Sequence, residues 1–298
     1  MPATPRAEVE VSDGLVRQLI ADQHADLAEL PIARGEAGWD NFMFRLGSSL
    51  AVRMPRRELG ARLIENEQRW LPTLAGGLPL PVPSPIRVGL PGRGYPWRWS
   101  IVPWLVGRSA NLAPPDAGQA VPLARFLLAL HRPAPADAPV NPARGVPIAQ
   151  RAGDSNRLSQ LRDKTSAITP AVERAWQEGL RAAPTTGKVW LHGDLHPRNV
   201  LVCDGAITGI IDWGDMSGGD PAVDLASVWM LLADAGAREV ALQHYGASAE
   251  TIARAKAWAV LFGVVLLENG LVDNPAHAAI GEATLGRITE DQKLATKG

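Results

Sequence analysis

Several residue types are scarce in this chain of 298 residues, and each shortage excludes a class of protein. The single cysteine, Cys203, excludes an intrachain disulfide and a zinc site made of several cysteines. The charges nearly cancel, with 30 lysines and arginines against 31 aspartates and glutamates, so a surface that coats nucleic acid is not expected. The longest apolar stretch, Ala257–Leu267, has about half of the ~20 residues that a membrane span needs. We therefore expect neither a nucleic-acid partner nor a membrane partner.

Signals for export and for internal repeats are also missing. The first residues, MPATPRAEVEVSD, contain no apolar segment of the kind that directs secretion, and no long repeat is visible. We expect a cytoplasmic protein, whose oligomeric state the sequence does not indicate. What is present is an ordinary globular composition, 46% hydrophobic and 20% charged, in a length that suggests about two domains.

The balance of charge hides an asymmetry along the chain. Residues 1–210 contain 24 basic and 19 acidic side chains, whereas residues 211–298 contain 6 basic and 12 acidic ones. This division is either a chance property of solvated surface or the sign of a front part that handles anions and a back part that holds cations.

The first part of the chain predicts a small sheet with helices. Strands are expected at residues 30–34, 42–46, 50–54, 86–89 and 99–105, which are short apolar runs next to turn residues. Helices are expected at residues 14–24, with Asp13 as the cap, and at residues 58–71, where Leu59, Leu63, Trp70 and Leu71 recur at helical spacing. Pro72 should kink or stop the second helix.

Loop-forming residues after Val106 suggest a boundary between a first domain, 1–106, and a second domain, 107–298. The second domain is expected to be mainly helical, with an exposed loop at 133–145 and with Asp154 as a helix cap. Its expected helices are 117–132, 155–164, 170–183, 221–235, 249–271 and 275–288, and its expected strands are 189–191, 200–203 and 206–211.

The last two of these strands predict a hairpin. Asp204-Gly205 between two apolar runs favours a type I′ turn, in which Val202 pairs with Ile207. This register places Asn199 opposite Ile210.

The same register brings Asn199 and Asp212 to one end of the hairpin, next to the loop that contains Asp194. Amide and carboxylate oxygens are ligands that Mg²⁺ prefers, and Asp194 can accept the proton of a hydroxyl. Phosphoryl transfer requires these parts. Two rival interpretations are a turn merely braced by His192 and Asp194, and a metal hydrolase in which His192-x-Asp194-x-His196 chelates zinc, although the other histidines are scattered.

The segment His192-Gly193-Asp194-Leu195-x-x-x-Asn199 is similar to the H-R-D-L-x-x-x-N catalytic loop of protein kinases, and Asp212-Trp213-Gly214 resembles their D-F-G. Glycine in place of arginine, together with Gly38-Trp39-Asp40-Asn41, Val52-Arg53-Met54-Pro55 and Gly219-Asp220-Pro221-x-x-Asp224, resembles the aminoglycoside phosphotransferase family over roughly residues 33–232.

That resemblance implies an α+β, two-lobe, protein-kinase-like fold, with a small N-terminal β-sheet lobe and a larger, mainly helical C-terminal lobe. It also implies an O-phosphotransferase that uses Asp194 as the catalytic residue and Mg²⁺ held by Asn199 and Asp212. The donor would be ATP or GTP, and the small-molecule acceptor a hydroxyl of an aminoglycoside-type antibiotic. The acidic back half of the chain suits a cationic acceptor of this kind.

On the nucleotide side, the resemblance implies that Arg53 grips the α- and β-phosphates and that a helix glutamate holds it. Glu67 fits that role because it lies on the apolar face of its helix, where a carboxylate needs a cation. Kinases carry lysine at the position of Arg53, so nucleotide geometry or affinity can differ here. The loop 35–41 lacks a G-x-G-x-x-G motif, yet Gly38 and Asn41 can cover phosphates with backbone N–H groups.

Five further residues have weaker assignments. His192 is expected to brace the loop, whereas His196 either touches phosphate or substrate or packs. Asp215 either lines the substrate cleft or caps a helix. Asp224 lies in an apolar helix and should accept N–H groups of the catalytic loop. Glu268 is a candidate for binding a cationic acceptor.

Two other functions remain open. A metabolite kinase of the same fold would act on a sugar, a choline-like alcohol or a macrolide. A pseudokinase would bind nucleotide without transferring phosphate, which the replacement of lysine by Arg53 makes plausible.

Overall fold

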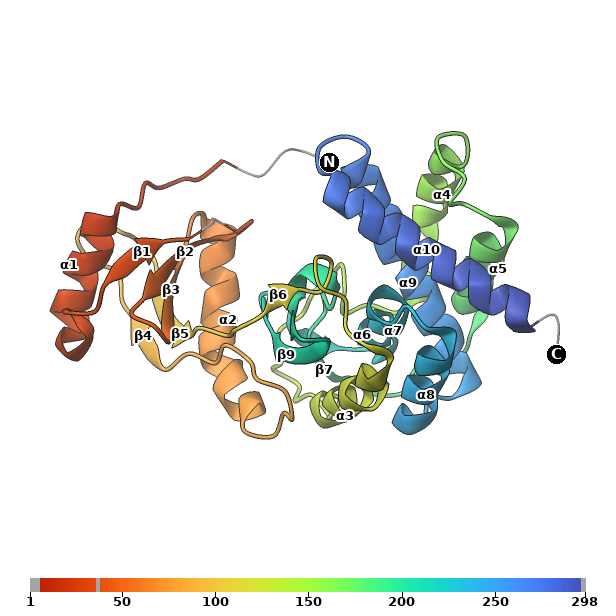
Figure 1. Cartoon of the computed structure of the whole chain (residues 1–298), viewed down its shortest axis with the longest axis horizontal. Coiled ribbons are helices and arrows are strands. Elements are labelled where there is room, and N and C mark those ends of the chain that lie inside the picture. The colour runs from red at the N-terminus through yellow and green to blue at the C-terminus, as the bar shows by residue number, and fades with distance from the viewer. Residues whose placement is uncertain (1–5, 36–37, 296–298) are drawn as a thin grey trace.

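The computed structural model describes residues 6–35 and 38–295 and has the expected two-lobe α+β fold (Figure 1). The N-terminal lobe contains a five-stranded antiparallel sheet in the order β1-β2-β3-β5-β4. Its strands are β1 (Ile32–Arg34), β2 (Asn41–Leu46), β3 (Leu50–Pro55), β4 (Arg87–Gly89) and β5 (Trp99–Pro103). All five strands predicted from the sequence are therefore present, with small shifts at their ends.

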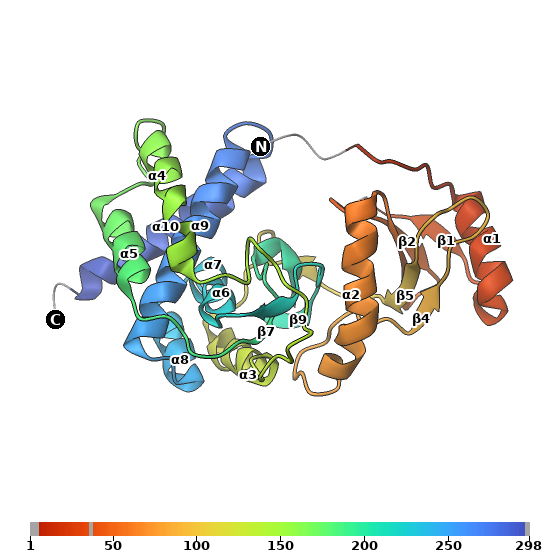
Figure 2. The same ribbon diagram turned by 180° about the vertical axis from the view of Figure 1, so that it is seen from behind.

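The two faces of this sheet have different partners. Side chains alternate along β3, so Val52 and Met54 enter an apolar core that also includes residues of α1 (Asp13–Gln23). Arg53 points to the opposite face, which α2 (Glu58–Ala75) covers (Figure 2). The central strand of the lobe therefore presents one charged side chain to a helix that also reaches the second lobe.

Helix α2 continues through Pro72 to Ala75, so the predicted end near Leu71 is wrong. Proline removes one backbone hydrogen bond, but Leu71 and Leu74 on either side of it are buried in the core of the C-terminal lobe, which favours a continued helix. The predicted apolar face is also partly wrong, because Leu59 is 52% exposed. The buried face consists of Gly60, Ala61, Ile64, Glu67, Leu71 and Leu74.

The C-terminal lobe surrounds α9 (Ala249–Gly270), most of whose residues are buried. Helices α5 (Pro170–Arg181) and α10 (Pro275–Ala295) pack against it. The remaining α-helices are α3 (Ala120–Leu130), α4 (Ser155–Arg162), α6 (Ala222–Leu225), α7 (Ser227–Leu231) and α8 (Ala235–Tyr245). In the described ranges, 6–35 and 38–295, no helix combines the length and the apolar character that crossing a bilayer requires.

Some helix ends differ from the sequence prediction. The expected helix at 221–235 is divided into α6 and α7. Helix α8 was not predicted; Asp234 caps it by accepting the N–H of Ala237 (2.7 Å). Ser12, rather than Asp13, caps α1. Asp154 does not cap α4, because two arginines engage its carboxylate.

The strands of the C-terminal lobe are β6 (Arg108–Ser109), β7 (Val189–Leu191), β8 (Val200–Cys203), β9 (Ala206–Ile210) and β10 (Ser217–Gly219). In the β8–β9 hairpin, Val202 pairs with Ile207, as predicted. Beyond that pair Thr208 forms a bulge, and its hydroxyl donates to a carbonyl of the segment that joins the lobes (2.6 Å). Asn199 consequently faces Ile211 instead of the predicted Ile210, and its carbonyl accepts the N–H of Ile211 (2.9 Å).

Candidate active site

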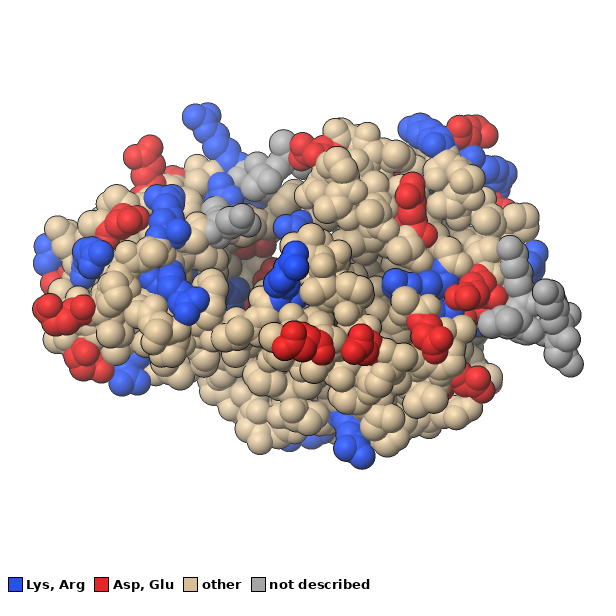
Figure 3. All heavy atoms as spheres, in the orientation of Figure 1, with Lys and Arg blue, Asp and Glu red and all other residues tan. Residues whose placement is uncertain are grey.

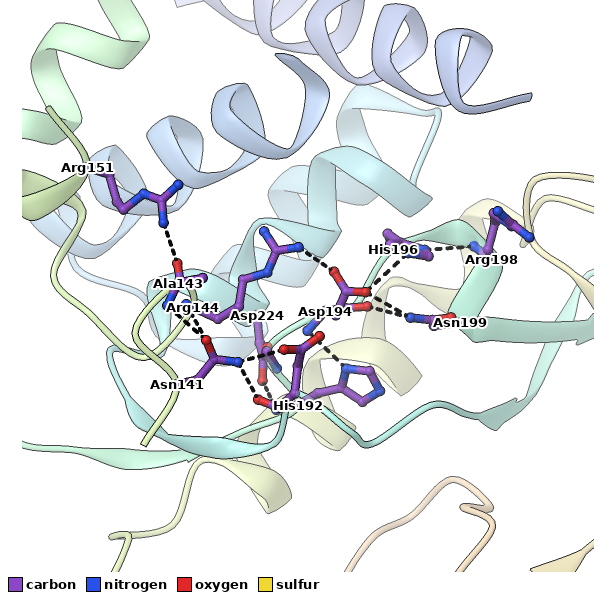
Figure 4. A network of polar contacts seen from close by, with 12 residues as sticks. Asn141, Ala143, Arg144, Arg151, His192, Asp194, His196, Arg198, Asn199 and Asp224 are labelled. Carbon is purple, nitrogen blue, oxygen red and sulfur yellow. Dashed lines mark hydrogen bonds and ion pairs between the residues drawn. The ribbon is translucent and has the colours of Figure 1, made fainter. Parts of the chain in front are cut away.

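The loop between β7 and the short 3₁₀ turn η4 (Pro197–Asn199) is fixed by Asp224 on α6 (Figure 4). Asp224 is fully buried, and its two carboxylate oxygens accept the backbone N–H groups of His192 (2.7 Å) and Gly193 (2.8 Å). Gly193 has a φ of +85°, and a Cβ there would lie 2.5 Å from the carbonyl oxygen of Asp215. The sequence-predicted contact between Asp224 and this loop is therefore present, and the loop requires glycine where protein kinases have arginine.

His192 braces the same loop through both ring nitrogens. Its Nε2 lies 3.0 Å from the carbonyl of Ile211, and its Nδ1 accepts the N–H of Asp194 (3.2 Å). The ring is fully buried with its edge toward Trp213. Neither nitrogen is available to zinc, and residues 6–35 and 38–295 contain no group of three or more His, Cys, Asp or Glu that could hold a metal. The zinc hydrolase alternative is therefore not supported.

Asp194 lies at the centre of a polar network. Asn199 Nδ2 donates to its carbonyl oxygen (2.9 Å), His196 Nε2 lies 3.3 Å from Oδ2, and Arg144 Nη2 donates to Oδ1 (3.0 Å). Burial opposes the ionised form, but His196 and Arg144 outweigh burial and lower the pKa of Asp194. The carboxylate is thus ionised at neutral pH, the state in which it can orient a hydroxyl and accept its proton.

Asn199 and Asp212 offer two oxygens at the same end of the hairpin. Asn199 is 6% exposed and turns its Nδ2 toward Asp194; among the described residues nothing donates to its Oδ1. Asp212 adopts a left-handed backbone (φ +64°), and its side chain is 59% exposed. One amide oxygen and one accessible carboxylate suit Mg²⁺, which completes its shell with phosphate and water oxygens.

Arg53 and Glu67 form the buried pair that the sequence predicted. The two guanidinium Nη atoms donate to the two carboxylate oxygens, with Nη2 to Oε1 at 3.0 Å, and Asp212 Oδ1 lies 3.9 Å from Nη2. Burial opposes the charge on Arg53, but Glu67 and Asp212 outweigh burial and raise the pKa of Arg53. A permanent cation is therefore fixed beside the exposed carboxylate of Asp212, as phosphate binding requires.

The turn at 38–41 lies over the start of α2. Gly38 N–H donates to the carbonyl of Asn41 (2.9 Å), and Arg57 Nη2 donates to the carboxylate of Asp40 (2.6 Å). A Cβ on Gly60 would lie 2.6 Å from the carbonyl of Asp40, so glycine permits this close approach. Asn41 Oδ1 is buried without a partner among the described atoms. Residues 36 and 37 of the predicted phosphate loop lie outside the described residues.

A cleft of about 350 Å³ brings the two lobes' residues together. The N-terminal lobe contributes Gly38, Asn41 and Arg53, and the C-terminal lobe contributes Arg198 and Asp212. The surface is hollowed between the lobes in Figure 3. A larger groove of about 850 Å³ next to α8 contains none of the predicted site residues, so the smaller cleft is the candidate site.

Sequence reasoning missed two arginines of this site. Arg144 contacts Asp194 from the loop that was expected to be exposed at 133–145. Arg198 lines the cleft and donates to Nε2 of His277 (2.5 Å), whose pKa is lowered by burial and by Arg198. The proline and glycine near Arg144 predicted only a loop. The sequence does not indicate which distant residue a side chain in such a loop contacts.

Asp215 and Glu268, two of the residues with weaker assignments, both have side-chain partners in the structure. Asp215 accepts a hydrogen bond from Asn141 Nδ2 (2.7 Å), and burial and the charge of Asp194 raise the pKa of Asp215. Glu268, the candidate for binding a cationic acceptor, accepts a hydrogen bond from Arg157 Nη1. The structure thus pairs the carboxylate that was predicted to bind a cationic acceptor.

Comparisons with known proteins agree with this architecture. Residues 31–258 match the model of the phosphotransferase enzyme family. Among solved structures, the fold is similar to the GDP and kanamycin complex of APH(2")-IIia, with 18% identity, a TM-score of 0.65, and coverage of 93% of this chain and 98% of that chain. It is also similar to macrolide 2'-phosphotransferase MphH from Brachybacterium faecium, with 22% identity, a TM-score of 0.59, and coverage of 91% and 97%.

A third similar structure is the gentamicin complex of APH(2")-IIa, with 18% identity, a TM-score of 0.58, and coverage of 93% and 97%. Comparison with curated proteins found no match. At these identities the solved structures establish the fold.

Proposed function

The chain belongs to the phosphotransferase enzyme family, and from this premise we propose that it transfers the γ-phosphoryl group of a nucleoside triphosphate to a hydroxyl of a small molecule. One observation carries the proposal: the ionised Asp194 contacts Asn199, while Asp212 reaches the buried Arg53–Glu67 pair. A proton acceptor, two metal-ligand oxygens and a phosphate-binding cation are the parts that phosphoryl transfer requires.

In this proposal the two lobes divide the work. Residues 1–106 bind the nucleotide, with Arg53 on the α- and β-phosphates and with Gly38 and Asn41 over them. Residues 107–298 supply the catalytic loop and the acceptor site. Glu67 has the role of fixing the guanidinium, because a two-pronged ion pair restricts its orientation. ATP and GTP both fit this scheme.

Asn199 and Asp212 are the residues that would hold Mg²⁺, which supplies positive charge to the phosphate oxygens. Asp194 orients the acceptor hydroxyl and takes up its proton at the carboxylate as the oxygen attacks the γ-phosphorus. The bond from the γ-phosphorus to the β–γ bridging oxygen breaks, and the nucleoside diphosphate leaves. His192 and Asp224 act through the loop backbone, since their contacts hold the main chain on either side of Asp194.

The proposed function is tested with a panel of candidate acceptor compounds. Kanamycin and gentamicin are named in two of the similar structures and a macrolide phosphotransferase in a third, so aminoglycosides and macrolides come first. Sugars and choline-like alcohols represent the metabolite kinase alternative. Each compound is incubated with the protein and Mg-ATP or Mg-GTP, and the phosphorylated product is identified by mass spectrometry.

We expect product that depends on Mg²⁺ and on an acceptor, and that disappears in the Asp194→Asn variant. Binding of magnesium nucleotide without transfer to any compound of the panel would favour the pseudokinase alternative. Transfer that survives Asp194→Asn would refute the role given to this carboxylate.

A further inference from the structure

The segment that follows α3 is fastened beside the catalytic loop by Asn141 (Figure 4). Asn141 Nδ2 donates to the carboxylate of Asp215 (2.7 Å), and its Oδ1 accepts the backbone N–H groups of Ala143 and Arg144 (both 2.9 Å). Arg151 Nη1 also donates to the carbonyl of Ala143 (3.1 Å). These contacts fix the backbone from which the Arg144 side chain extends.

Arg144 points from this turn to Asp194. Its Nη2 donates to Asp194 Oδ1 (3.0 Å), and its guanidinium carbon lies 4.5 Å from the ring centre of Phe262 on α9. Among the described residues nothing accepts a hydrogen bond from its Nε or Nη1, although the side chain is only 23% exposed. The guanidinium therefore keeps donor groups for a ligand that approaches Asp194.

Three other carboxylates of the C-terminal lobe, those of Asp154, Asp215 and Glu268, already have side-chain partners. Arg157 engages both Glu268 and Asp154, and Arg151 Nε donates to Asp154 (2.8 Å). Asp215 is bonded to Asn141, and its raised pKa disfavours the anion. The guanidinium of Arg144 therefore offers unused donors next to Asp194, while the carboxylates of Asp215 and Glu268 are already engaged by other side chains.

An acceptor hydroxyl that reaches Asp194 brings its neighbouring groups next to Arg144. An ammonium group there is repelled by the guanidinium, whereas an oxygen accepts its hydrogen bonds. We propose that Arg144 is a specificity-determining residue, which favours acceptors with a carboxylate or hydroxyl oxygen beside the reacting hydroxyl and disfavours acceptors with an ammonium group at that place. This inference rests on the proposed function, because it places the acceptor at Asp194.

The first test is equilibrium binding of kanamycin, a polycation, to the wild type, Arg144→Gln and Arg144→Lys without nucleotide. Removal of the positive charge should tighten kanamycin binding by at least about tenfold relative to the wild type, which is one 1.4 kcal/mol step in free energy. Arg144→Lys keeps the charge and should bind like the wild type. Melting temperatures within about 2 °C of one another would show that the fold is intact.

Each outcome of this titration either supports or overturns the proposed role of Arg144. Tighter binding by Arg144→Gln alone supports the proposal. Kanamycin binding that is equally tight in the wild type and Arg144→Gln overturns it, and so does failure of all three proteins to bind, because the charge of Arg144 is then not what excludes the cation.

The second test compares three acceptors that share one sugar ring: glucuronate, glucose and glucosamine. The ratio of kcat/KM for glucuronate to that for glucosamine should fall by at least about tenfold in Arg144→Gln, and an unchanged ratio would contradict the proposal. If none of the three sugars is phosphorylated, kanamycin binding decides alone. The proposed function fails separately, through loss of nucleotide binding or through transfer that ignores Asp194→Asn.

Discussion

Each lobe contains one arginine–carboxylate pair of the proposed site, and the two pairs differ in access to solvent. In the N-terminal lobe, the side chains of Arg53 and Glu67 are 7% and 2% exposed. In the C-terminal lobe, the side chains of Arg144 and Asp194 are 23% and 19% exposed. The first pair joins a strand to a helix inside one lobe, whereas the second joins the loop after α3 to the loop that contains Asp194.

The difference indicates two separate uses of the same chemistry. A buried ion pair must stay together, because loss of either partner leaves a charge without water or counter-ion. A partly exposed pair exchanges its partner for a ligand at a lower cost than a fully buried pair, since water reaches part of each charge. The pair that we propose to bind the donor is therefore built into the fold, and the pair that we propose to face the acceptor is easier to rearrange. Four substitutions test this contrast, beginning with the largest effect.

Asp194→Asn should lower the rate of phosphoryl transfer by roughly 10²–10⁴-fold, because the amide cannot accept the proton of the acceptor hydroxyl. Steady-state kinetics at saturating nucleotide measures the change. Asp204→Asn is the matched control: Asp204 lies at the exposed hairpin turn with φ of +49°, which asparagine also adopts, so its rate should equal that of the wild type. Equal losses in both variants would contradict the assignment.

Glu67→Ala should destabilise the protein by about 3–5 kcal/mol, because it leaves Arg53 buried without its counter-ion. Denaturant unfolding measures this loss. Glu65 lies exposed on the same helix, and Glu65→Ala should stay within about 0.5 kcal/mol of the wild type. A small effect of Glu67→Ala would mean that water reaches Arg53 and that the two pairs do not differ as proposed.

Asp224→Asn should cost about 1–3 kcal/mol, since the amide can accept only one of the two buried N–H groups that the carboxylate accepts. The rate of transfer should fall with stability, because His192 and Gly193 lead directly to Asp194. Asp273→Asn, at an exposed position after α9, controls for the change of charge. If the two variants unfold at the same denaturant concentration, the backbone contacts of Asp224 do not support the loop.

Asp215→Asn should have the smallest effect, a gain in stability that depends on pH. The pKa of Asp215 is raised by burial and by Asp194, so wild-type stability decreases as pH rises from the ordinary aspartate pKa through the raised value. The variant lacks this loss and still accepts the hydrogen bond from Asn141. Unfolding free energies should therefore differ at neutral pH and coincide in acid. A difference that persists in acid would assign the effect to packing.

The sequence predicted the Arg53–Glu67 pair but did not predict the Arg144–Asp194 pair, for a physical reason. The spacing within one strand and one helix determines that Arg53 and Glu67 leave their backbones on facing surfaces, so the pair could be inferred from periodicity. Asp204-Gly205 similarly fixed the turn of the hairpin. The bulge at Thr208 could not be inferred, because it depends on a hydrogen bond to the segment that joins the lobes.

The contacts made by Arg144 and Arg157 join distant parts of the chain. Arg144 is 50 residues from Asp194, and Arg157 is 111 residues from Glu268. No local pattern determines such pairs, which form only after the helices have packed. The acidic excess of residues 211–298 therefore suggested a cationic acceptor, whereas in the folded chain Arg157, from an earlier part of the sequence, engages Glu268.

The central claim is that donor binding belongs to the Arg53–Glu67 pair and proton acceptance to Asp194, which lie in different lobes. Calorimetric titration of magnesium ATP and magnesium GTP into the Asp194→Asn variant tests this separation most directly. The account predicts a Kd within about threefold of the wild-type value, a difference of less than 1 kcal/mol. Loss of nucleotide binding in a variant that melts like the wild type would contradict it.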